Sequence, residues 1–383
     1  MKGKCAALLL LLCLLLAGCG GGNPAPSGTP VKLEYAKLLM IEQHQGYRLV
    51  TITDPWKEGA VLCRYALVNR QDGNIAAPDL WEKPARLPEG TIIIHVPLKR
   101  LCVSTSVHSA LLGRLGAADC ISSICEGKYI HDSIIRQRLD HGIIKDVGSG
   151  LNPSVEKIVQ LQTDGLLMSP FEGASYGLLE KTGIPIIECA DYMERSALGR
   201  AEWIKFYGML VGKEFEAEQI FSDIASNYNR LKDMAATREN HPKLIADMMS
   251  GNTWFMPGGS STYGSLYKDA GADFSVVDAD VNGTQPLSPE KVLLKAVDAD
   301  VWIIKYNRPE DYDYVSLSNE NHTYEQFAAF KNHHIYGCNT TDVPFYDEAP
   351  FRPDLLLGDI ISLLYPDLLP NWKRRFYKPL AIN

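Results

Sequence analysis

One cysteine near the start of the chain has the setting of a lipid-attachment site. Lys2 and Lys4 precede an apolar run from Ala6 to Leu16, and residues 16–19 (LAGC) then place a thiol directly after small residues. A plain secretory leader needs small residues at its cleavage site but no cysteine there. We therefore expect cleavage before Cys19 and a mature lipoprotein anchored on the periplasmic side of a bacterial membrane. The alternative is an ordinary leader with a chance cysteine.

The rest of the composition argues against several classes of protein. The 383-residue chain carries a net charge of −8 and no dense Lys/Arg patch, which argues against nucleic-acid binding. It contains no GxSxG elbow, no Walker loop and no HExxH, so neither catalysis nor a resident cofactor is expected. After removal of the leader, the length suits two domains.

The six cysteines beyond Cys19 do not form a recognisable metal or redox motif. They contain no CxxC pair, so neither a zinc ribbon nor a thioredoxin-like site is predicted; they are Cys63, Cys102, Cys120, Cys125, Cys189 and Cys338. Cys102 and Cys189 lie within apolar runs and are expected in the core. Cys120 and Cys125 flank a short segment and could pair in an oxidising compartment, which the sequence leaves open.

The first part of the mature chain has a β-like pattern. Residues 19–30 are rich in Gly, Pro and Ser and predict a tether. A β-rich extension over residues 31–95 follows, with apolar or alternating segments at 47–53 and 61–68. We expect a small set of antiparallel strands that leads into residues 91–96.

Beyond this extension, short apolar strands alternate with helices, which predicts two α/β lobes with parallel sheets. In the first lobe, residues 96–200, we expect strands at 101–104, 121–124, 165–168 and 185–189, and helices at 107–115, 153–161 and 176–181. In the second lobe, residues 238–383, we expect strands at 244–248, 274–277, 301–304 and 335–336, and helices at 261–270, 289–296, 324–330 and 353–364 with a short helix after them.

The linking segment, residues 201–237, contains the longest periodic stretch. Helices are predicted at 201–210 and at 215–235, where apolar residues recur on one helical face. A helix of about 22 residues spans roughly 33 Å, which is enough to bridge two lobes. The expected fold class is therefore α/β, with two Rossmann-like lobes joined by one long α-helix and preceded by a β-rich extension.

The order of these pieces resembles the substrate-binding lipoproteins of ABC importers for iron–siderophore, haem and cobalamin. The matching stretches extend over about residues 97–370 and are 96–105, 111–121, 146–148, 152–158, 161–167, 183–186, 269–272, 287–292, 299–302 and 327–332. Thr163 departs from the pattern, because relatives usually have proline there. The resemblance implies capture of a metal chelate between the lobes, delivery to an ABC permease with its ATPase, and a monomeric binding protein.

The resemblance also gives a role to Glu156 and Glu290. Each acid lies in the first turn of a predicted helix, where carboxylates are favoured by the helix dipole, so simple capping acids are the plain interpretation. In relatives, one exposed glutamate on each lobe docks into an arginine pocket of the permease, and these two positions match. A charge-assisted pair with arginine is directional and suits docking.

Ligand-contacting side chains are expected on the loops at strand ends that face the opposite lobe. In the first lobe these candidates are Ser104, Thr105, Ser106, Tyr129, His131, Phe171, Tyr192 and Arg195. In the second lobe they are Trp254, Gly258, Gly259, Tyr306, Arg308 and Arg352. Trp254 stands beside a Met-Pro-Gly-Gly sequence that predicts a loop, where an aromatic ring would suit a planar ligand. If the ligand is haem, Tyr129 and His131 are possible axial ligands.

Two alternatives to chelate binding remain. A free zinc or manganese binder would need three histidines and a carboxylate in the cleft, and only His108 and His131 are well placed. The adjacent His333 and His334 would diverge on a strand, so no metal site is assigned to them. A surface enzyme or adhesin could instead use the extension at 31–95 as its working part.

Overall fold

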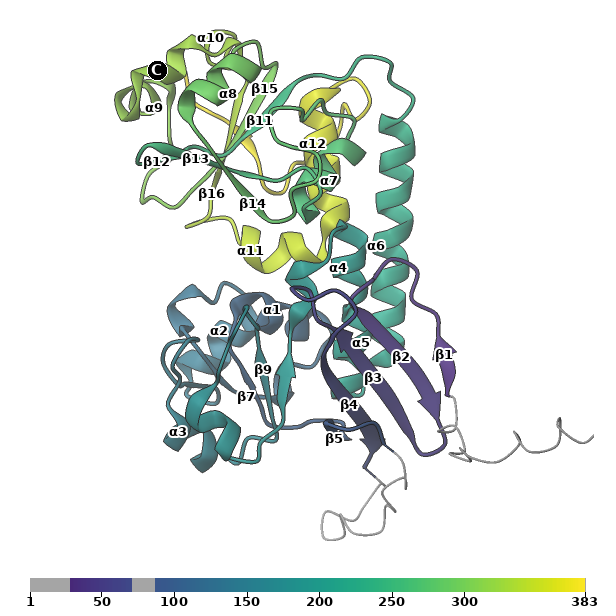
Figure 1. Ribbon diagram of the computed structural model, residues 1–383. Coiled ribbons are helices and arrows are strands. Elements are labelled where there is room, and N and C mark those ends of the chain that lie inside the picture. The colour runs from purple at the N-terminus through teal and green to yellow at the C-terminus, as the bar shows by residue number, and fades with distance from the viewer. Residues whose placement is uncertain (1–27, 71–86, 383) are drawn as a thin grey trace, which may run out of the picture.

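A computed structural model of the protein describes residues 28–70 and 87–382. Two α/β lobes lie one above the other, a long helix runs beside both, and an N-terminal sheet packs near the lower half of that helix (Figure 1). The predicted fold class is confirmed. Cys19 and the predicted leader lie outside the described residues. Among those that are described, no helix combines the length and apolarity needed to cross a membrane.

The N-terminal sheet has five strands in sequential order. They are β1 (Thr29–Val31), β2 (Leu39–His44), β3 (Tyr47–Thr53), β4 (Val61–Asn69) and β5 (Thr91–Val96). The first four are antiparallel, but β5 runs parallel to β4, which corrects the expectation of a fully antiparallel sheet. The connection from residue 70 to 90 is long enough for a parallel return, which a tight hairpin cannot provide.

The first lobe contains a fully parallel sheet in the order β10-β9-β6-β7-β8. Its strands are β6 (Leu101–Val103), β7 (Ile121–Ile124), β8 (Lys145–Asp146), β9 (Gly165–Met168) and β10 (Ile186–Glu188), and its α-helices are α1 (Ser106–Arg114), α2 (Ser133–Asp140) and α3 (Val155–Gln160). The four predicted strands are present, whereas β8 and α2 were not predicted. The strand order reverses at β6, and ligands of open α/β sheets bind beyond the carboxyl ends at such a point.

The second lobe has two small sheets. One has the order β11 (Leu244–Ala246), β15 (Val301–Tyr306), β16 (Ile335–Asn339) and β17 (Lys378–Pro379), and the other is the antiparallel set β12 (Met249–Ser250), β13 (Thr253–Pro257) and β14 (Thr284–Leu287). The α-helices are α7 (Thr262–Asp269), α8 (Pro289–Ala296), α9 (Tyr314–Glu320), α10 (Ala328–Lys331), α11 (Phe345–Glu348) and α12 (Pro353–Leu364).

Three predictions for this lobe were wrong. Phe274, Val276 and Val277 are buried, but residues 274–277 form a turn rather than a strand, because apolar residues indicate burial and not hydrogen-bond pairing. The helix predicted over 324–330 is interrupted at Phe327, whose backbone is extended. After α12 the described chain contains β17 and no further helix.

Helix α4 (Ala197–Glu202) leads from the first lobe into the linking segment, which contains α5 (Ile204–Val211) and the 22-residue helix α6 (Glu214–Ala235). Helix α6 packs against α5 at one end and against α12 of the second lobe at the other (Figure 1). Gly208 permits the sharp α5–α6 turn, because a Cβ there would lie 2.6 Å from the Cβ of Ala217. One rigid helix therefore sets the spacing of the two lobes.

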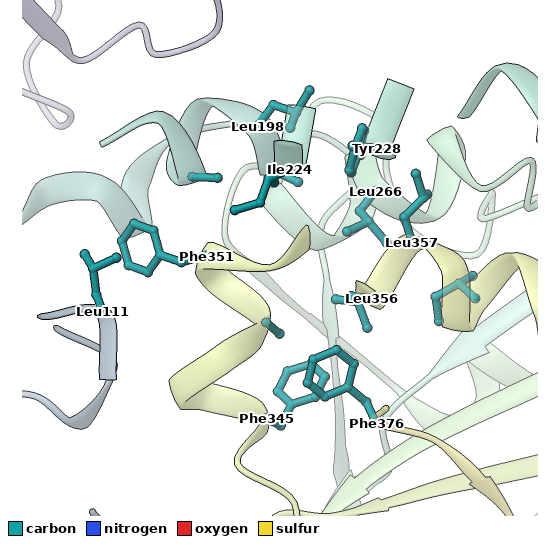
Figure 2. Close-up of a cluster of buried hydrophobic side chains, with 14 of the residues drawn as sticks. Leu111, Leu198, Ile224, Tyr228, Leu266, Phe345, Phe351, Leu356, Leu357 and Phe376 are labelled. Carbon is teal, nitrogen blue, oxygen red and sulfur yellow. The ribbon is translucent and has the colours of Figure 1, made fainter. Parts of the chain in front are cut away.

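A single apolar cluster continues from the first lobe into the second. Leu111 of α1 faces Phe351, and Leu356 and Leu357 of α12 lie near Leu266 on the far side (Figure 2). All five side chains are buried. Because the core is continuous across the junction, the two lobes are packed against each other and do not move independently.

A buried carboxylate holds the N-terminal sheet to the linking helices. Glu202, at the end of α4, is fully buried and accepts backbone N–H bonds from Glu34, Tyr35 and Ala36 at 3.0, 2.7 and 2.9 Å. The Nζ of Lys205 lies 3.3 Å from the same carboxylate. The loop before β2 is thereby fixed to the lobe junction.

Replacing Glu202 by glutamine should lower the free energy of unfolding by about 3 kcal/mol, because the amide keeps one neutral acceptor for three N–H groups. Urea unfolding measures the change. Glu218→Gln is the matched control: Glu218 also reaches Lys205, at 3.2 Å, but its side chain is 58% exposed, and its change should stay within about 0.5 kcal/mol. Equal effects of the two substitutions would contradict this role of Glu202.

Candidate functional site

The carboxyl ends of the parallel strands in the two lobes face a cleft that contains two adjoining cavities. The smaller cavity has a volume of about 460 Å³ and the larger one about 750 Å³. Lys305, Tyr306 and Tyr346 line both. The two cavities therefore form one continuous site with walls from both lobes.

The smaller cavity lies between the loops after β6 and β7 and the region around α11. The first lobe contributes Ser106, Tyr129 and His131 to its wall, and the second lobe contributes Lys305, Tyr306, Asn307, Thr340, Val343, Pro344, Phe345, Tyr346 and Asp347. The Nδ1 of His131 lies 3.1 Å from Oδ2 of Asp347, so a polar contact joins the lobes across the cavity.

The larger cavity is rich in aromatic rings and thioethers. The first lobe contributes Tyr192, Met193 and Arg200, and the second lobe contributes 247–250, 255–257, 261–263, 282–284, Lys305, Tyr306, Tyr312, Glu320 and Tyr346. Such a wall is mainly apolar but carries a few directed polar groups, as ligand pockets generally do.

Both cations of the larger cavity already have carboxylate partners. The Nε of Arg200 lies 3.0 Å from Oδ2 of Asp191, and the Nζ of Lys305 lies 2.5 Å from Oδ1 of Asp247. Burial acts to lower the pKa of Lys305, but the nearby Asp247 carboxylate outweighs it and raises that pKa. The Arg200–Asp191 and Lys305–Asp247 pairs each have a net charge close to zero. The site therefore does not need a strongly charged ligand to neutralise these cations.

Asp191 is the centre of a buried polar network below the cavity floor. It lies 2.8 Å from His108 Nε2 and accepts a hydrogen bond from the Tyr207 hydroxyl at 2.8 Å. Burial alone would raise the pKa of Asp191, but His108, Arg200 and Tyr207 together lower it to about 2. The other ring nitrogen of His108 lies 2.5 Å from Oγ1 of Thr105. Both ring nitrogens of His108 are therefore engaged within the fold.

The phenols of the cleft are hydrogen-bonding groups rather than phenolates. Burial raises the pKa of Tyr192, Tyr263, Tyr306 and Tyr312 above the ordinary value. At neutral pH these hydroxyls keep their protons and can donate to acceptor atoms on a ligand.

The structure brings together five of the predicted ligand residues. Ser106, Tyr129, His131, Tyr192 and Tyr306 line the two cavities.

The other nine candidates do not line the two cavities. Ser104 is buried, and Thr105 contacts His108. Arg308 stacks on the ring of Tyr312, with its guanidinium carbon 4.1 Å from the ring centroid. The remaining six are absent from both walls: Phe171, Arg195, Arg352, Trp254, Gly258 and Gly259.

The prediction for Trp254 is corrected by the structure. Its side chain is 1% exposed on β13, where it packs against Trp302, Tyr324 and Phe327. Its indole N–H donates to the backbone oxygen of Ala246 at 2.9 Å. The segment is a strand whose inward face belongs to the core, so the neighbouring Met-Pro-Gly-Gly did not indicate an exposed ring.

Gly258, Gly259 and Arg352 also have internal roles. A Cβ on Gly258 would lie 2.3 Å from the backbone oxygen of Val281, and one on Gly259 would lie 2.8 Å from the Cα of Ala279. These glycines allow two backbone segments to pack closely rather than admit a ligand. Arg352 forms a two-point ion pair with Asp354 at 2.8 and 2.9 Å.

Several residues of the cleft were missed from the sequence. Asp247 directly follows β11 and Lys305 is near the end of β15, so polar residues at strand ends were an available signal. Arg200 lies within helix α4, and nothing local marks it as a cleft residue. Its position depends on the packing of the linking helices.

Glu156 and Glu290 are both exposed and lie in equivalent local settings. The sequences SVEK (154–157) and SPEK (288–291) each place a serine at the N-cap, and its hydroxyl accepts the backbone N–H three residues on. For Glu290, its own backbone N–H and the Ser288 hydroxyl lower the carboxyl pKa. The cap of α3 is Ser154, one residue after the predicted Asn-Pro signal.

The fold and the cleft define a two-lobed α/β binding protein. A family model described as Periplasmic binding protein matches residues 121–340, more than half of the chain. The chain belongs to the periplasmic binding protein family.

Similar proteins extend the comparison over the whole chain. An uncharacterized lipoprotein of Methanocaldococcus jannaschii is 27% identical, over 97% of this chain and 94% of its own length. The high-affinity heme uptake system protein IsdE of Staphylococcus aureus is 23% identical over 58% of this chain and 75% of its own. A solved structure from Saccharomonospora viridis, of an ABC-type Fe3+-hydroxamate transport system, has a TM-score of 0.53 at 18% identity and covers 70% of this chain and 94% of that one.

Replacing Asp191 by asparagine should destabilise the protein by about 3 kcal/mol at neutral pH, because it leaves the Arg200 cation, whose side chain is only 13% exposed, uncompensated. The folded-state pKa of Asp191 is lowered, so its contribution is complete above the unfolded-state pKa and is lost as the pH falls through the acid range toward about 2. Urea unfolding should therefore show a difference from wild type that is constant from about pH 7 to pH 5 and shrinks as the pH falls from about 5 toward 2.

Asp140→Asn is the control for this prediction. Asp140 pairs with Arg136 at 3.5 Å but is 59% exposed, and its substitution should change the free energy of unfolding by less than about 0.5 kcal/mol. A difference between D191N and wild type that stays constant with pH would contradict the assigned charge state of Asp191.

Proposed function

We propose that this protein is the substrate-binding component of an ABC importer that captures a metal chelate in the inter-lobe cleft. The chelate is a ferric siderophore, haem or a corrinoid. The observation that carries the proposal is the cleft itself: walls from both lobes, aromatic rings around a large volume, and cations that are already paired. Such a site suits a large ligand with a flat or apolar surface and polar edges.

The donor groups favour a preformed chelate over a free metal ion. His108 has both ring nitrogens engaged, and His131 contacts Asp347. Among the described residues, no group of three or more His, Cys, Asp or Glu side chains is placed to hold a metal ion. In a chelate, the metal ion is already bound by the chelating molecule. The cleft then needs only a complementary shape and hydrogen-bonding groups.

The comparisons support the same class of ligand. The staphylococcal relative is named for haem uptake, and the Saccharomonospora structure for transport of a ferric hydroxamate. The Methanocaldococcus relative is named a lipoprotein, which agrees with lipid attachment at Cys19. We propose a membrane-anchored, monomeric protein divided into an extension at 31–95, lobes at 96–200 and 238–383, and linking helices at 201–237.

Within the cleft we propose that Tyr129, His131, Tyr192, Tyr306 and Tyr346 contact the chelate. They come from both lobes, and each has a polar tip on a ring that can pack against a ligand. Arg200 and Lys305 lie next to them, and a ligand carboxylate or catecholate edge could share either cation with its carboxylate partner.

Tyr346→Ala should weaken binding of the cognate chelate about tenfold or more, because this 56% exposed ring lines both cavities. Fluorescence or calorimetric titration with haemin, a ferric trihydroxamate and cyanocobalamin identifies the cognate ligand and measures the change. Phe171→Ala is the matched control, since Phe171 is 51% exposed and lies on neither wall. Tight binding of zinc or manganese salts, with no binding of any chelate, would reject the proposal in favour of a free-metal binder.

Glu156→Ala combined with Glu290→Ala should leave chelate affinity unchanged and stop uptake. The two acids are exposed, begin helices on different lobes and line neither cavity. Each would pair with a permease arginine at the docked interface, where loss of one partner costs about 2–5 kcal/mol. The measurement is transport in vesicles that contain the permease and ATPase, with ligand titration in parallel.

The control for this double variant is Glu58→Ala with Glu239→Ala. Both of these acids are also exposed, and the change in net charge is the same. Normal transport by the Glu156/Glu290 variant would refute docking through these acids. Loss of ligand binding would place them in the ligand site instead.

A further inference from the structure

Two cysteines share one face of the first-lobe sheet. Cys102 lies on β6, and Cys125 directly follows β7, where its backbone N–H donates to the Val103 oxygen at 3.1 Å. Side chains alternate along the strands: Val103 and Ile124 pack into the large core, whereas Cys102 and Cys125 pack into a separate cluster with Leu166 and Met168 of β9. The two thiols therefore point to the same side of adjacent strands.

The two side chains lie in the same small buried cluster, where each thiol is the main side-chain influence on the other, and their residues are 0% and 2% exposed. Cys120, the partner considered from the sequence, precedes β7 while Cys125 follows it. Five residues of extended chain separate their Cα atoms by roughly 16 Å, too far for a bond. In the fold, the cysteine closest to Cys125 is therefore Cys102, which is 23 positions away in the sequence, and not Cys120.

We propose that Cys102 and Cys125 form a disulfide when the chain folds in the presence of a disulfide donor, as in an oxidising compartment. The thiolate of one of the two cysteines attacks a donor disulfide, forms a mixed disulfide and releases one donor thiol. The other cysteine then loses its proton and attacks the sulfur of the first, and the second donor thiol leaves. Two cysteine thiols are oxidised and one donor disulfide is reduced to two thiols.

Both sulfurs are buried in the folded lobe, so exchange takes place before β6 and β7 close, or when they open transiently.

The bond would join two segments that lead into the cleft. Ser106 follows β6 by three residues, and Tyr129 and His131 follow Cys125 within one loop. A cross-link directly beneath both loops would restrain this wall of the smaller cavity. The inference concerns folding of the lobe and does not depend on which ligand the cleft binds.

The experiment uses the full chain, purified with reduced thiols and incubated with glutathione disulfide in urea just below the unfolding midpoint. Free thiols are then alkylated and the protein is digested without reductant for mass spectrometry. The expected product is a peptide pair linked through Cys102 and Cys125, with Cys63, Cys120, Cys189 and Cys338 alkylated. Alkylation of both Cys102 and Cys125, or linkage of either to another cysteine, would overturn the proposal.

Two variants and a melting measurement complete the test. Cys120→Ser should retain the linked peptide, and Cys125→Ser should leave Cys102 alkylated. Oxidised wild-type protein should melt about 5 °C above the reduced form, whereas the two treatments of Cys125→Ser should give the same temperature. If Cys125→Ser does not fold, the linkage found in wild type and in Cys120→Ser decides the question.

Discussion

Three buried carboxylates at the lobe junction, those of Asp191, Glu194 and Glu202, are the constraint on which the rest of the structure depends. Each is almost fully removed from water, and a buried carboxylate without partners would cost several kcal/mol. Asp191 is compensated by Arg200 and His108. The other two carboxylates are compensated mainly by backbone N–H groups of the N-terminal segment and by neighbouring side chains.

These carboxylates connect parts of the chain that are distant in sequence. Glu194 accepts the backbone N–H groups of Lys37 and Leu38 and the indole N–H of Trp203. Its own backbone oxygen accepts the Thr262 hydroxyl of the second lobe at 2.6 Å. One residue thus touches the N-terminal sheet, the linking helices and the second lobe, and the relative positions of the three are coupled through it.

The N-terminal sheet consequently acts as part of the lobe junction rather than as a separate module. Tyr35 packs edge-on against Phe221 of α6, and Arg48 pairs with Glu214 at the start of that helix at 2.7 Å. The long helix is held by the sheet on one side and by the lobes on others. This arrangement limits hinge motion, so closure around a ligand is expected to be small, with the His131–Asp347 contact already bridging the cleft.

The amino-acid sequence by itself determined the α/β class, most strands of the first lobe, the long helix and the exposed settings of Glu156 and Glu290, because period, caps and apolar runs are local signals. It also marked the loop that supplies Tyr129 and His131 and the strand end that supplies Tyr306. Only the tertiary structure decided which side chains meet. Trp254 is a core residue because it lies on the inward face of strand β13. Arg200 reaches the cleft from helix α4 because the buried carboxylate of Asp191 orients its side chain. Cavity walls and ion pairs are contacts between distant segments, and local periodicity carries no information about them.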